Sequence, residues 1–202
     1  MFFFLFPLCF LIQIIFQFQQ YLFLVINFLL FLHFPSKQLI NNIFFLDYFK
    51  SKNKIGDQGL IGLGSGLANC TNLSNLTIYL GENQIGDQGL LGLGSGLANC
   101  TNISQLELYL RYNKFGDQGI LDLSSALVNC TNLSYFKLDI GQNQFRAICT
   151  SELGSALANC TNLTKLILAF GYDQISKSQA QKVKSKCNKS KKLVALTINY
   201  SW

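Results

Sequence analysis

The sequence predicts an α/β solenoid, a stack of about five similar units of 30 residues each. The two clearest units, Ile55–Asn72 and Ile85–Asn102, differ only at Ile61 versus Leu91. Looser copies of the unit follow at Phe115–Ile140, Phe145–Phe170 and Ile175–Tyr200. Within each unit, one stretch alternates apolar and polar residues as a strand does, and another spaces its leucines as a helix does. Self-similarity at a period of about 20–50 residues is typical of stacked arrays, so the period decides the fold class.

The first part of the chain, residues 1–36, is a hydrophobic segment of a different kind. Phe2–Phe34 contains no Asp, Glu, Lys or Arg, and about 20 mostly apolar residues are enough for a helix to span a bilayer. The first cations of the chain follow the segment, at Lys37, Lys50, Lys52 and Lys54. Because Lys and Arg concentrate on the cytoplasmic side of membranes, we expect a single transmembrane helix before the repeats, with the repeats facing the cytoplasm.

Two other interpretations of this segment stay open. In one, the segment is an apolar cap over the end of the solenoid, and the chain is cytoplasmic. In the other, it is an artefact of a gene model, because Phe, Leu, Ile, Asn and Lys are what translated AT-rich sequence yields. Three pairs of residues 30 apart extend the repeat register upstream: Ile43 and Leu73, Leu46 and Leu76, and Asn53 and Asn83. We therefore place the repeat domain at residues 42–202, and its start inside a repeat favours truncation or fusion of a longer array.

The strand half of each unit is predicted from its alternation. Leu76, Ile78 and Leu80 alternate with Thr77 and Tyr79, the period-2 pattern of a half-buried strand. The same alternation recurs at Leu106–Leu110, Phe136–Ile140, Leu166–Phe170 and Leu196–Tyr200. A polar residue follows each strand, at Asn83, Asn113, Asn143 and Asp173. An inward-facing Asn amide can bond backbone groups of its own and the next repeat, so we expect a structural ladder of asparagines.

The helix half of each unit begins with the turn I-G-D-Q-G. Asp57, Asp87 and Asp117 are well placed to cap the helix that follows. The helix is predicted from apolar residues at helical spacing, Leu60, Leu63 and Leu67 in the first full unit and Leu90, Leu93 and Leu97 in the next. Glycines such as Gly62, Gly64 and Gly66 weaken it by about 1 kcal/mol each relative to Ala. Stacking has to offset that loss, and small residues allow adjacent helices to approach closely.

The last two units depart from this pattern. Residues 146–149 of the fourth unit read R-A-I-C in place of G-D-Q-G, so we expect its helix to start later, near Thr150 or Ser151. The fifth unit replaces the apolar helix face with a lysine-rich sequence that keeps only Ala180, Val183 and Cys187 at inward positions. A polar last repeat shields the end of an array from solvent, so capping is the first explanation of this basic run.

The consensus L-x-x-L-x-I-x-L-x-x-N-x-I-G-D-x-G, as in Leu73–Gly89, followed by a leucine-spaced helix and N-C, resembles the leucine-rich repeat of the ribonuclease-inhibitor-like class. The resemblance extends over Ile43–Trp202. It implies a horseshoe with a parallel concave sheet inside and helices outside, here preceded by the apolar helix. The N-C-T-N-L repeats are similar to those of large ciliate families, some members of which are named as kinase-domain proteins.

Catalytic and cofactor motifs are lacking in this sequence. G-L-G-S-G at Gly62–Gly66 lies inside a helix and lacks G-K-[ST], so it does not indicate phosphate binding. No kinase signature is present, and His33, the single histidine, lies in an apolar run and offers no catalytic base. No C-x-x-C pair suggests zinc. We therefore expect no enzyme activity, no cofactor, no metal and no small-molecule substrate.

The recurring cysteines and the basic run are also explained by structure rather than by chemistry. Four of the seven cysteines occupy one repeat position, at Cys70, Cys100, Cys130 and Cys160. Stacking would bring these thiols near each other, at risk of oxidation, but Cys is also a common core residue. We favour the core interpretation and a reducing, cytosolic setting. The lysine run lacks interleaved aromatic residues for base stacking, so no nucleic acid is expected.

What remains for function is the exposed face of the sheet. Two rows of outward positions run across the strands, and they vary between repeats where the scaffold positions do not. Tyr and Arg are typical anchors of protein interfaces. We therefore predict a protein-binding patch on the concave sheet, made of Tyr79, Glu107, Tyr109, Arg111, Lys137 and Asp139. An ordinary solvated sheet face is the plain alternative to this patch.

The leading hypothesis is a non-enzymatic protein–protein interaction module tethered to a membrane. The alternative is a fragment or decayed copy of a larger repeat protein, without an independent function. Near-identical neighbouring units and the start inside a repeat both favour recent duplication and rearrangement.

Overall fold

The computed structural model describes residues 44–46, 54–171 and 175–199. The chain separates into two compact units, residues 1–38 and 39–202, and the described residues all belong to the second. The expected transmembrane helix lies outside them, as does Asp173. Among the helices that the structure does describe, none is both long and apolar enough to cross a bilayer.

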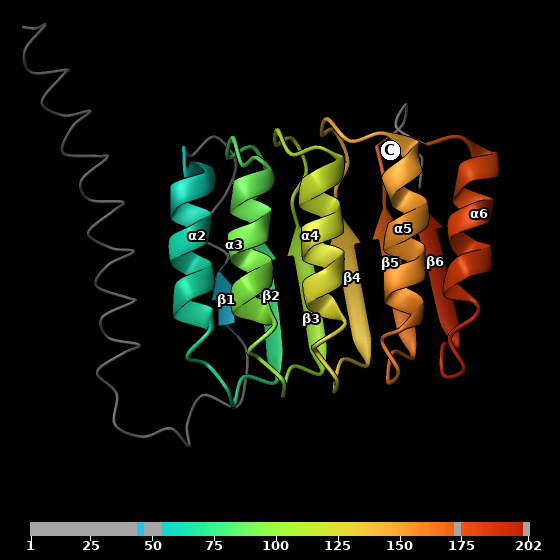
Figure 1. The fold of residues 1–202 in the computed structure, drawn as a ribbon, viewed down its shortest axis with the longest axis horizontal. Helices are drawn as coiled ribbons and strands as arrows, with labels where there is room; N and C mark the ends of the chain where they lie inside the picture. The colour runs from blue at the N-terminus through green and yellow to red at the C-terminus, as the bar shows by residue number, and fades with distance from the viewer. Residues whose placement is uncertain (1–43, 47–53, 172–174, 200–202) are drawn as a thin grey trace, which may run out of the picture. The chain divides into compact units, whose positions relative to one another are not determined.

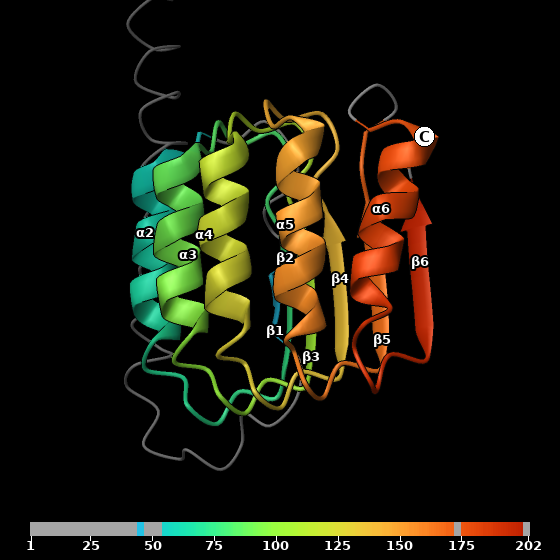
Figure 2. The same ribbon diagram turned by 45° about the vertical axis from the view of Figure 1, so that its right-hand side comes forward.

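The second unit alternates strands and helices in two layers, with the helices against one face of the sheet (Figures 1 and 2). The strands are β1 (Phe44–Leu46), β2 (Asn75–Tyr79), β3 (Gln105–Tyr109), β4 (Tyr135–Asp139), β5 (Lys165–Ala169) and β6 (Ala195–Asn199). The helices are α2 (Gly56–Leu67), α3 (Asp87–Leu97), α4 (Asp117–Leu127), α5 (Ala147–Ala158) and α6 (Lys177–Cys187). The predicted α/β solenoid with a parallel sheet and outer helices is therefore confirmed.

The six described strands form one parallel sheet in the order of the sequence. From β2 to β6 the register equals the repeat, so that Leu76 pairs with Leu106, and Leu106 with Phe136. At β1 the register differs from the expectation. Leu46 pairs with Ile78 rather than with Leu76, an offset of 32 residues instead of 30. A shift of two residues leaves each side chain on the same face of a sheet, which is why the alternation in the sequence did not reveal it.

The core lies between the two layers and contains the inward-facing residues of both. Cys100, Cys130 and Cys160 belong to it, and each thiol donates to a carbonyl 33 residues earlier, as from Cys100 Sγ to Leu67 O at 3.1 Å. All cysteines in the described residues are free thiols. Burial raises the pKa of the Cys100 thiol to about 12, so it stays protonated at neutral pH. The interpretation as small core residues is confirmed for these three positions.

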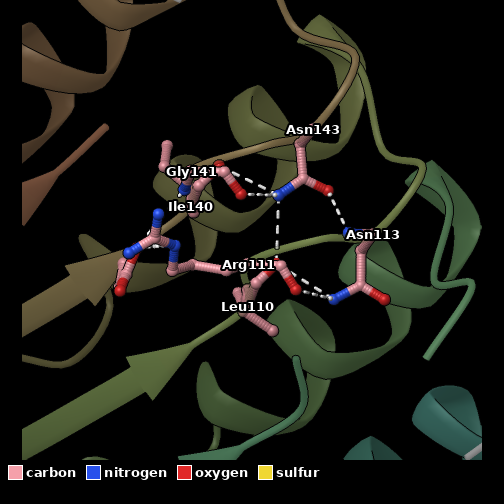
Figure 3. A network of polar contacts seen from close by, with 7 residues as sticks. Leu110, Arg111, Asn113, Ile140, Gly141 and Asn143 are labelled. Atoms are coloured by element: carbon pink, nitrogen blue, oxygen red, sulfur yellow. Dashed lines mark hydrogen bonds and ion pairs between the residues drawn. The ribbon is translucent and has the colours of Figure 1, made fainter. Parts of the chain in front are cut away.

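Asn113 and Asn143, which follow β3 and β4, form the expected ladder (Figure 3). Asn113 Oδ1 accepts from the backbone N–H groups of Asn83 and Ile85 at 2.9 and 3.0 Å. Its Nδ2 donates to Leu80 O and Leu110 O, both at 2.9 Å. Asn143 repeats the pattern one unit later and accepts from Asn113 N at 3.0 Å. Each of these two amides thus satisfies backbone groups of its own repeat and of the preceding one, rather than of the next as expected.

The aspartate at the start of each helix reaches in the other direction. Asp57 Oδ1 accepts from the backbone N–H of Gly86 at 2.6 Å and of Gly89 at 3.0 Å, both at the start of α3. Asp87 does the same for Gly116 and Gly119 at the start of α4, at 2.7 and 2.9 Å. The expectation that each aspartate caps the helix it opens is wrong, because the carboxylate instead caps the helix of the following repeat.

This forward capping explains why the fourth helix starts earlier than expected. α5 begins at Ala147, not near Thr150 or Ser151. Its first turn is capped by Asp117 of the previous repeat, which accepts from Arg146 N at 2.6 Å and from Arg146 Nε at 3.0 Å. The absence of an aspartate in the fourth repeat therefore leaves the cap of α5 unaffected. It removes the cap of the next helix instead.

That next helix, α6, supplies its own cap. Ser176 Oγ accepts from Gln179 N at 3.3 Å, and Gln179 Oε1 accepts from Ser176 N at 2.6 Å. This reciprocal pair is a capping box. α6 is the one described helix with a side-chain cap from its own N-cap residue, and it is also the helix whose predecessor has Ala147 in place of the aspartate.

The glycines of the helices fall into two kinds. A Cβ at Gly96 would overlap the carbonyl oxygen of Gly64, and a Cβ at Gly64 would overlap that of Gly92. α2 and α3 therefore pack backbone against backbone, as expected from their small residues. Gly62, in contrast, has open space around its Cβ position. Only part of the glycine content is required for packing.

The two kinds of glycine should respond oppositely to alanine. We expect Gly96→Ala to reduce the free energy of unfolding by about 3 kcal/mol, because the added methyl group meets rigid backbone. Gly62→Ala should raise it by up to about 1 kcal/mol, because alanine favours the helix and meets no obstacle. Urea denaturation of both variants measures this difference. Equal effects at the two sites would contradict the close helix packing.

The forward cap should be visible one repeat away from the substituted residue. We expect Asp87→Ala to reduce the free energy of unfolding by about 1 kcal/mol. Hydrogen exchange should accelerate at the amides of Gly116 and Gly119 in α4 and not at Gly86 in α3. Gln88→Ala, at an exposed neighbour in the same turn, serves as the control. Loss of protection confined to α3 would show that Asp87 caps its own helix.

Candidate functional site

The candidate site lies on the face of the sheet that points away from the helices (Figure 2). Along β2, Leu76 and Ile78 point to the core and are buried, whereas Thr77 and Tyr79 are half-buried on the opposite face. The parallel register aligns these outer positions in rows. Tyr79 pairs with Tyr109, and Tyr109 with Asp139. In the neighbouring row Glu107 pairs with Lys137.

A tyrosine pair forms the centre of this face. The rings of Tyr79 and Tyr109 stack with centroids 4.4 Å apart and planes 9° apart. The Tyr109 hydroxyl donates to Glu107 Oε2 at 2.7 Å. Burial raises the pKa of this hydroxyl above its usual value, and the bond to the Glu107 carboxylate raises it further. Tyr109 thus remains a neutral hydrogen-bond donor throughout the physiological pH range.

Lys137 completes a short chain of polar contacts on the pair. Its Nζ donates to the Tyr109 hydroxyl at 2.7 Å and lies 4.6 Å from the centroid of the same ring. Tyr109 therefore accepts from a cation and donates to a carboxylate, an arrangement in which each contact fixes the next. The lysine, the tyrosine and the glutamate come from two adjacent strands, β3 and β4.

An ion pair at the ends of the same strands continues the surface. Arg111 Nε lies 3.7 Å from Asp139 Oδ1. Burial raises the pKa of the Asp139 carboxyl, although the N–H of Gly141 and the charges of Arg111 and Lys137 oppose the shift. The position of Arg111 is glycine in three other repeats, at Gly81, Gly141 and Gly171, and serine in the last, at Ser201. Arg111 is thus a departure of one repeat from the scaffold.

The structure brings all six predicted residues into this one area. Two further aromatic contacts lie beside them, outside the predicted patch. Lys165 Nζ lies 5.2 Å from the centroid of the Tyr135 ring, in a third row at the starts of the strands. Tyr112 is 54% exposed, and the Arg111 guanidinium lies 5.6 Å from its ring. Tyr135 and Lys165 lie outside the two rows that the alternation defines, and Tyr112 lies in a turn whose backbone the sequence does not specify.

That turn has an unusual backbone. Tyr112 has a φ of 56°, and the equivalent residues Glu82 and Gln142 have 57° and 56°. The left-handed region favours Gly or Asn, so the sequence gives no sign of it here. An open hollow lies at this edge of the sheet, lined by Glu82, Gln84, Tyr112, Asn113, Lys114 and Gln142. Within the described residues, no group of three or more His, Cys, Asp or Glu side chains is arranged to hold a metal ion.

Comparisons with known proteins agree with the geometry. The family described as Leucine Rich repeat matches residues 72–94, which contain β2 and the turn into α3. Residues 72–94 are therefore similar to a leucine-rich repeat. The solved structure of Leiomodin-1 Actin-Binding Site 2 has a similar fold, with a TM-score of 0.51 and 15% identity over 77% of this chain and 82% of that one. A search of curated protein sequences finds no match.

The 30-residue repeats also separate scaffold positions from variable ones. The buried leucines, the ladder asparagines and the capping aspartates recur with the repeat period. The six site residues do not, apart from Tyr79 and Tyr109, which share one repeat position and stack on each other. The site is thus built from the side chains that the repeat leaves free to vary.

Proposed function

We propose that this chain is a non-enzymatic interaction module that binds another protein through the sheet face containing Tyr79, Glu107, Tyr109, Arg111, Lys137 and Asp139. The stacked Tyr79 and Tyr109, held by Lys137 and Glu107 at 2.7 Å contacts, are the observation that supports it most. Tyrosine supplies a large contact area, and tyrosine and arginine are enriched among residues that dominate binding energies. No catalytic group is needed for this role.

The order of this surface favours binding. Because the rings and charges already hold one another in place, little side-chain freedom would be lost on association. A solvated face without function would not require four successive side chains to contact each other. The alternative of a decayed repeat fragment predicts, instead, that substitutions here change no interaction.

The charges of the surface also suggest the kind of partner. Two cations, Lys137 and Arg111, are balanced by two carboxylates, Glu107 and Asp139, and each charge has a partner inside the surface. We therefore expect a partner surface that is largely uncharged, and an affinity that depends weakly on salt. Charged interfaces, by contrast, lose association rate as ionic strength rises.

We assign the repeats to the ribonuclease-inhibitor-like class, because each described repeat has one strand and one full α-helix. Leiomodin-1 is named for actin binding, so actin is a reasonable first partner to assay. At 15% identity the likeness supports the fold and not the shared partner. The choice is therefore only a starting point for the experiment.

The binding hypothesis is tested by removing the tyrosine stack. We expect Tyr79→Ala combined with Tyr109→Ala to weaken the binding of a captured partner by about 30-fold or more. The circular dichroism spectrum should stay unchanged. Partners are captured with the full chain, compared by quantitative mass spectrometry, and then measured one by one, actin included. Gln58→Ala combined with Gln88→Ala is the control, because both glutamines are exposed on the helix layer. If the two double variants retain the same partners as the native chain, the sheet face is not the binding surface.

We further propose that Phe2–Phe34 tethers the module to a membrane, with the repeats on the cytoplasmic side. The support is the absence of charged residues across this stretch and the lysines that follow it. The full chain should then stay in the membrane fraction through carbonate and high-salt washes. Phe18→Lys combined with Leu24→Lys should release it, since each charge at a helix centre costs about 3 kcal/mol of insertion free energy. Release of the native chain by the washes would refute the tether.

A further inference from the structure

The last repeat differs from the others at positions through which a repeat contacts its neighbours. The first is the capping position, where Asp57, Asp87 and Asp117 bond the next helix. In α6 this position is Lys177, which is exposed. A lysine has no acceptor for the N–H groups at a helix start, and its charge opposes the positive end of a helix dipole. α6 thus lacks the group that would cap a further repeat.

The second position is the small residue that lets the next helix approach. A Cβ at Gly64 would overlap α3, and one at Gly94 would lie 3.1 Å from Ala126 Cβ in α4. A Cβ at Gly154 would lie 3.2 Å from Val183 O in α6. The equivalent residue of α6 is Lys184, also exposed. A long charged side chain at this position blocks another helix from packing in the same way.

A third difference lies just before each strand, where a hydroxyl side chain bonds the preceding repeat. Ser104 Oγ donates to Ser74 O at 3.1 Å, and Ser134 Oγ donates to Ser104 O at 3.0 Å. In the last repeat the hydroxyl is replaced by Val194, which is 88% exposed. Within β6, Leu196 and Ile198 are only partly buried, although their equivalents in β2 to β5 are buried. The end of the sheet thus presents apolar side chains beside the replaced hydroxyl.

The edge of β6 is also open in the described sheet. Strand order ends at β6, and the earlier strands show which groups point outward there. Leu80 N donates to Tyr109 O of the next strand, and Ser74 O accepts from Gln105 N. By the same geometry, the backbone N–H and C=O groups of Leu196 and Ile198 point away from β5, as does the carbonyl of Val194. Such an edge can accept an added strand.

Charge selects among the candidate occupants of this edge. Residues 175–199 contain seven lysines and no Asp or Glu; the lysines are Lys177, Lys182, Lys184, Lys186, Lys189, Lys191 and Lys192. Two copies of this end would repel each other, and a further repeat is opposed by Lys177 and Lys184. An extended acidic segment complements both the open edge and the charge.

We propose that the C-terminal end of the solenoid binds an acidic, extended segment of another protein, which pairs with β6 as an additional strand. The surface consists of Lys177, Lys184, Val194 and the outer edge of β6. It is separate from the site around Tyr79 and Tyr109 on the sheet face. Backbone pairing would supply affinity, Val194 an apolar contact, and the lysines a preference for Glu and Asp side chains.

The test uses the full chain and a labelled peptide of about ten residues that alternates Val and Glu, a length that suits strand addition. Fluorescence anisotropy should show binding that is at least about tenfold tighter than for the same peptide with Lys in place of Glu. Two N-methylated versions separate strand pairing from simple charge attraction. One is methylated at every odd amide and the other at every even amide, and only one of them should lose binding.

Matched lysine variants locate the surface. Lys184→Gln should weaken peptide binding by about threefold, whereas Lys182→Gln should leave the affinity unchanged. Lys182 occupies the position of Gly92, which faces the preceding helix through Ile61. Both variants remove one exposed lysine from α6, so their comparison excludes a general effect of charge. Val194→Thr, which restores a β-branched hydroxyl residue found in the fourth repeat, should also weaken binding.

Three results would overturn the proposal. Equal loss of binding with both methylated peptides would exclude strand pairing, and equal effects of the two lysine variants would exclude the end surface. A single-stranded oligonucleotide and vesicles with anionic lipid are used as competitors of the peptide. If either one binds more tightly than the peptide, the surface is a general polyanion site instead.

Discussion

The structure depends on side-chain hydrogen bonds that join each repeat to its neighbours at a constant offset. Asn113 reaches back to the backbone of the preceding repeat, and Asp87 reaches forward to the helix of the next. Both satisfy backbone groups that would otherwise lose water without gaining a partner, which is costly in a protein interior. Because the offset is fixed at about one repeat, an insertion or deletion in one unit would break bonds in two.

These bonds give the array a direction. α3, α4 and α5 receive their N-terminal cap from the preceding repeat. The aspartate of that repeat therefore sets the residue at which each helix begins. α6 departs from this rule and carries its own capping box at Ser176 and Gln179. The change coincides with the loss of the aspartate at Ala147. A helix that caps itself depends less on its predecessor, as suits a unit at the end of the described array.

Sequence periodicity was sufficient for the fold and for placing the six predicted residues on one face of the sheet, but not for local geometry. Alternation around Tyr79 and Tyr109 placed both on one face, and the constant period placed them in adjacent strands. The assumption that each motif acts within its own repeat was wrong. The helix start at Ala147 was misplaced because its cap comes from Asp117, 29 residues away from the bonded amide of Arg146. The left-handed turn at Tyr112 was not predicted, because a φ of 56° at a tyrosine has no sequence signature.

The sheet face and the C-terminal end of the array differ in whether their charges are paired, and this difference affects what each can bind. On the sheet face, Lys137 and Glu107 both hydrogen-bond to the Tyr109 hydroxyl, so these charges hold an aromatic side chain in place. At the end of the array, Lys177 and Lys184 are exposed, and no acid occurs between residues 175 and 199. A surface with internally paired charges discriminates by shape and apolar contact. A surface with uncompensated lysines discriminates by the sign of the partner's charge, so the two surfaces of one scaffold need not compete for the same ligand.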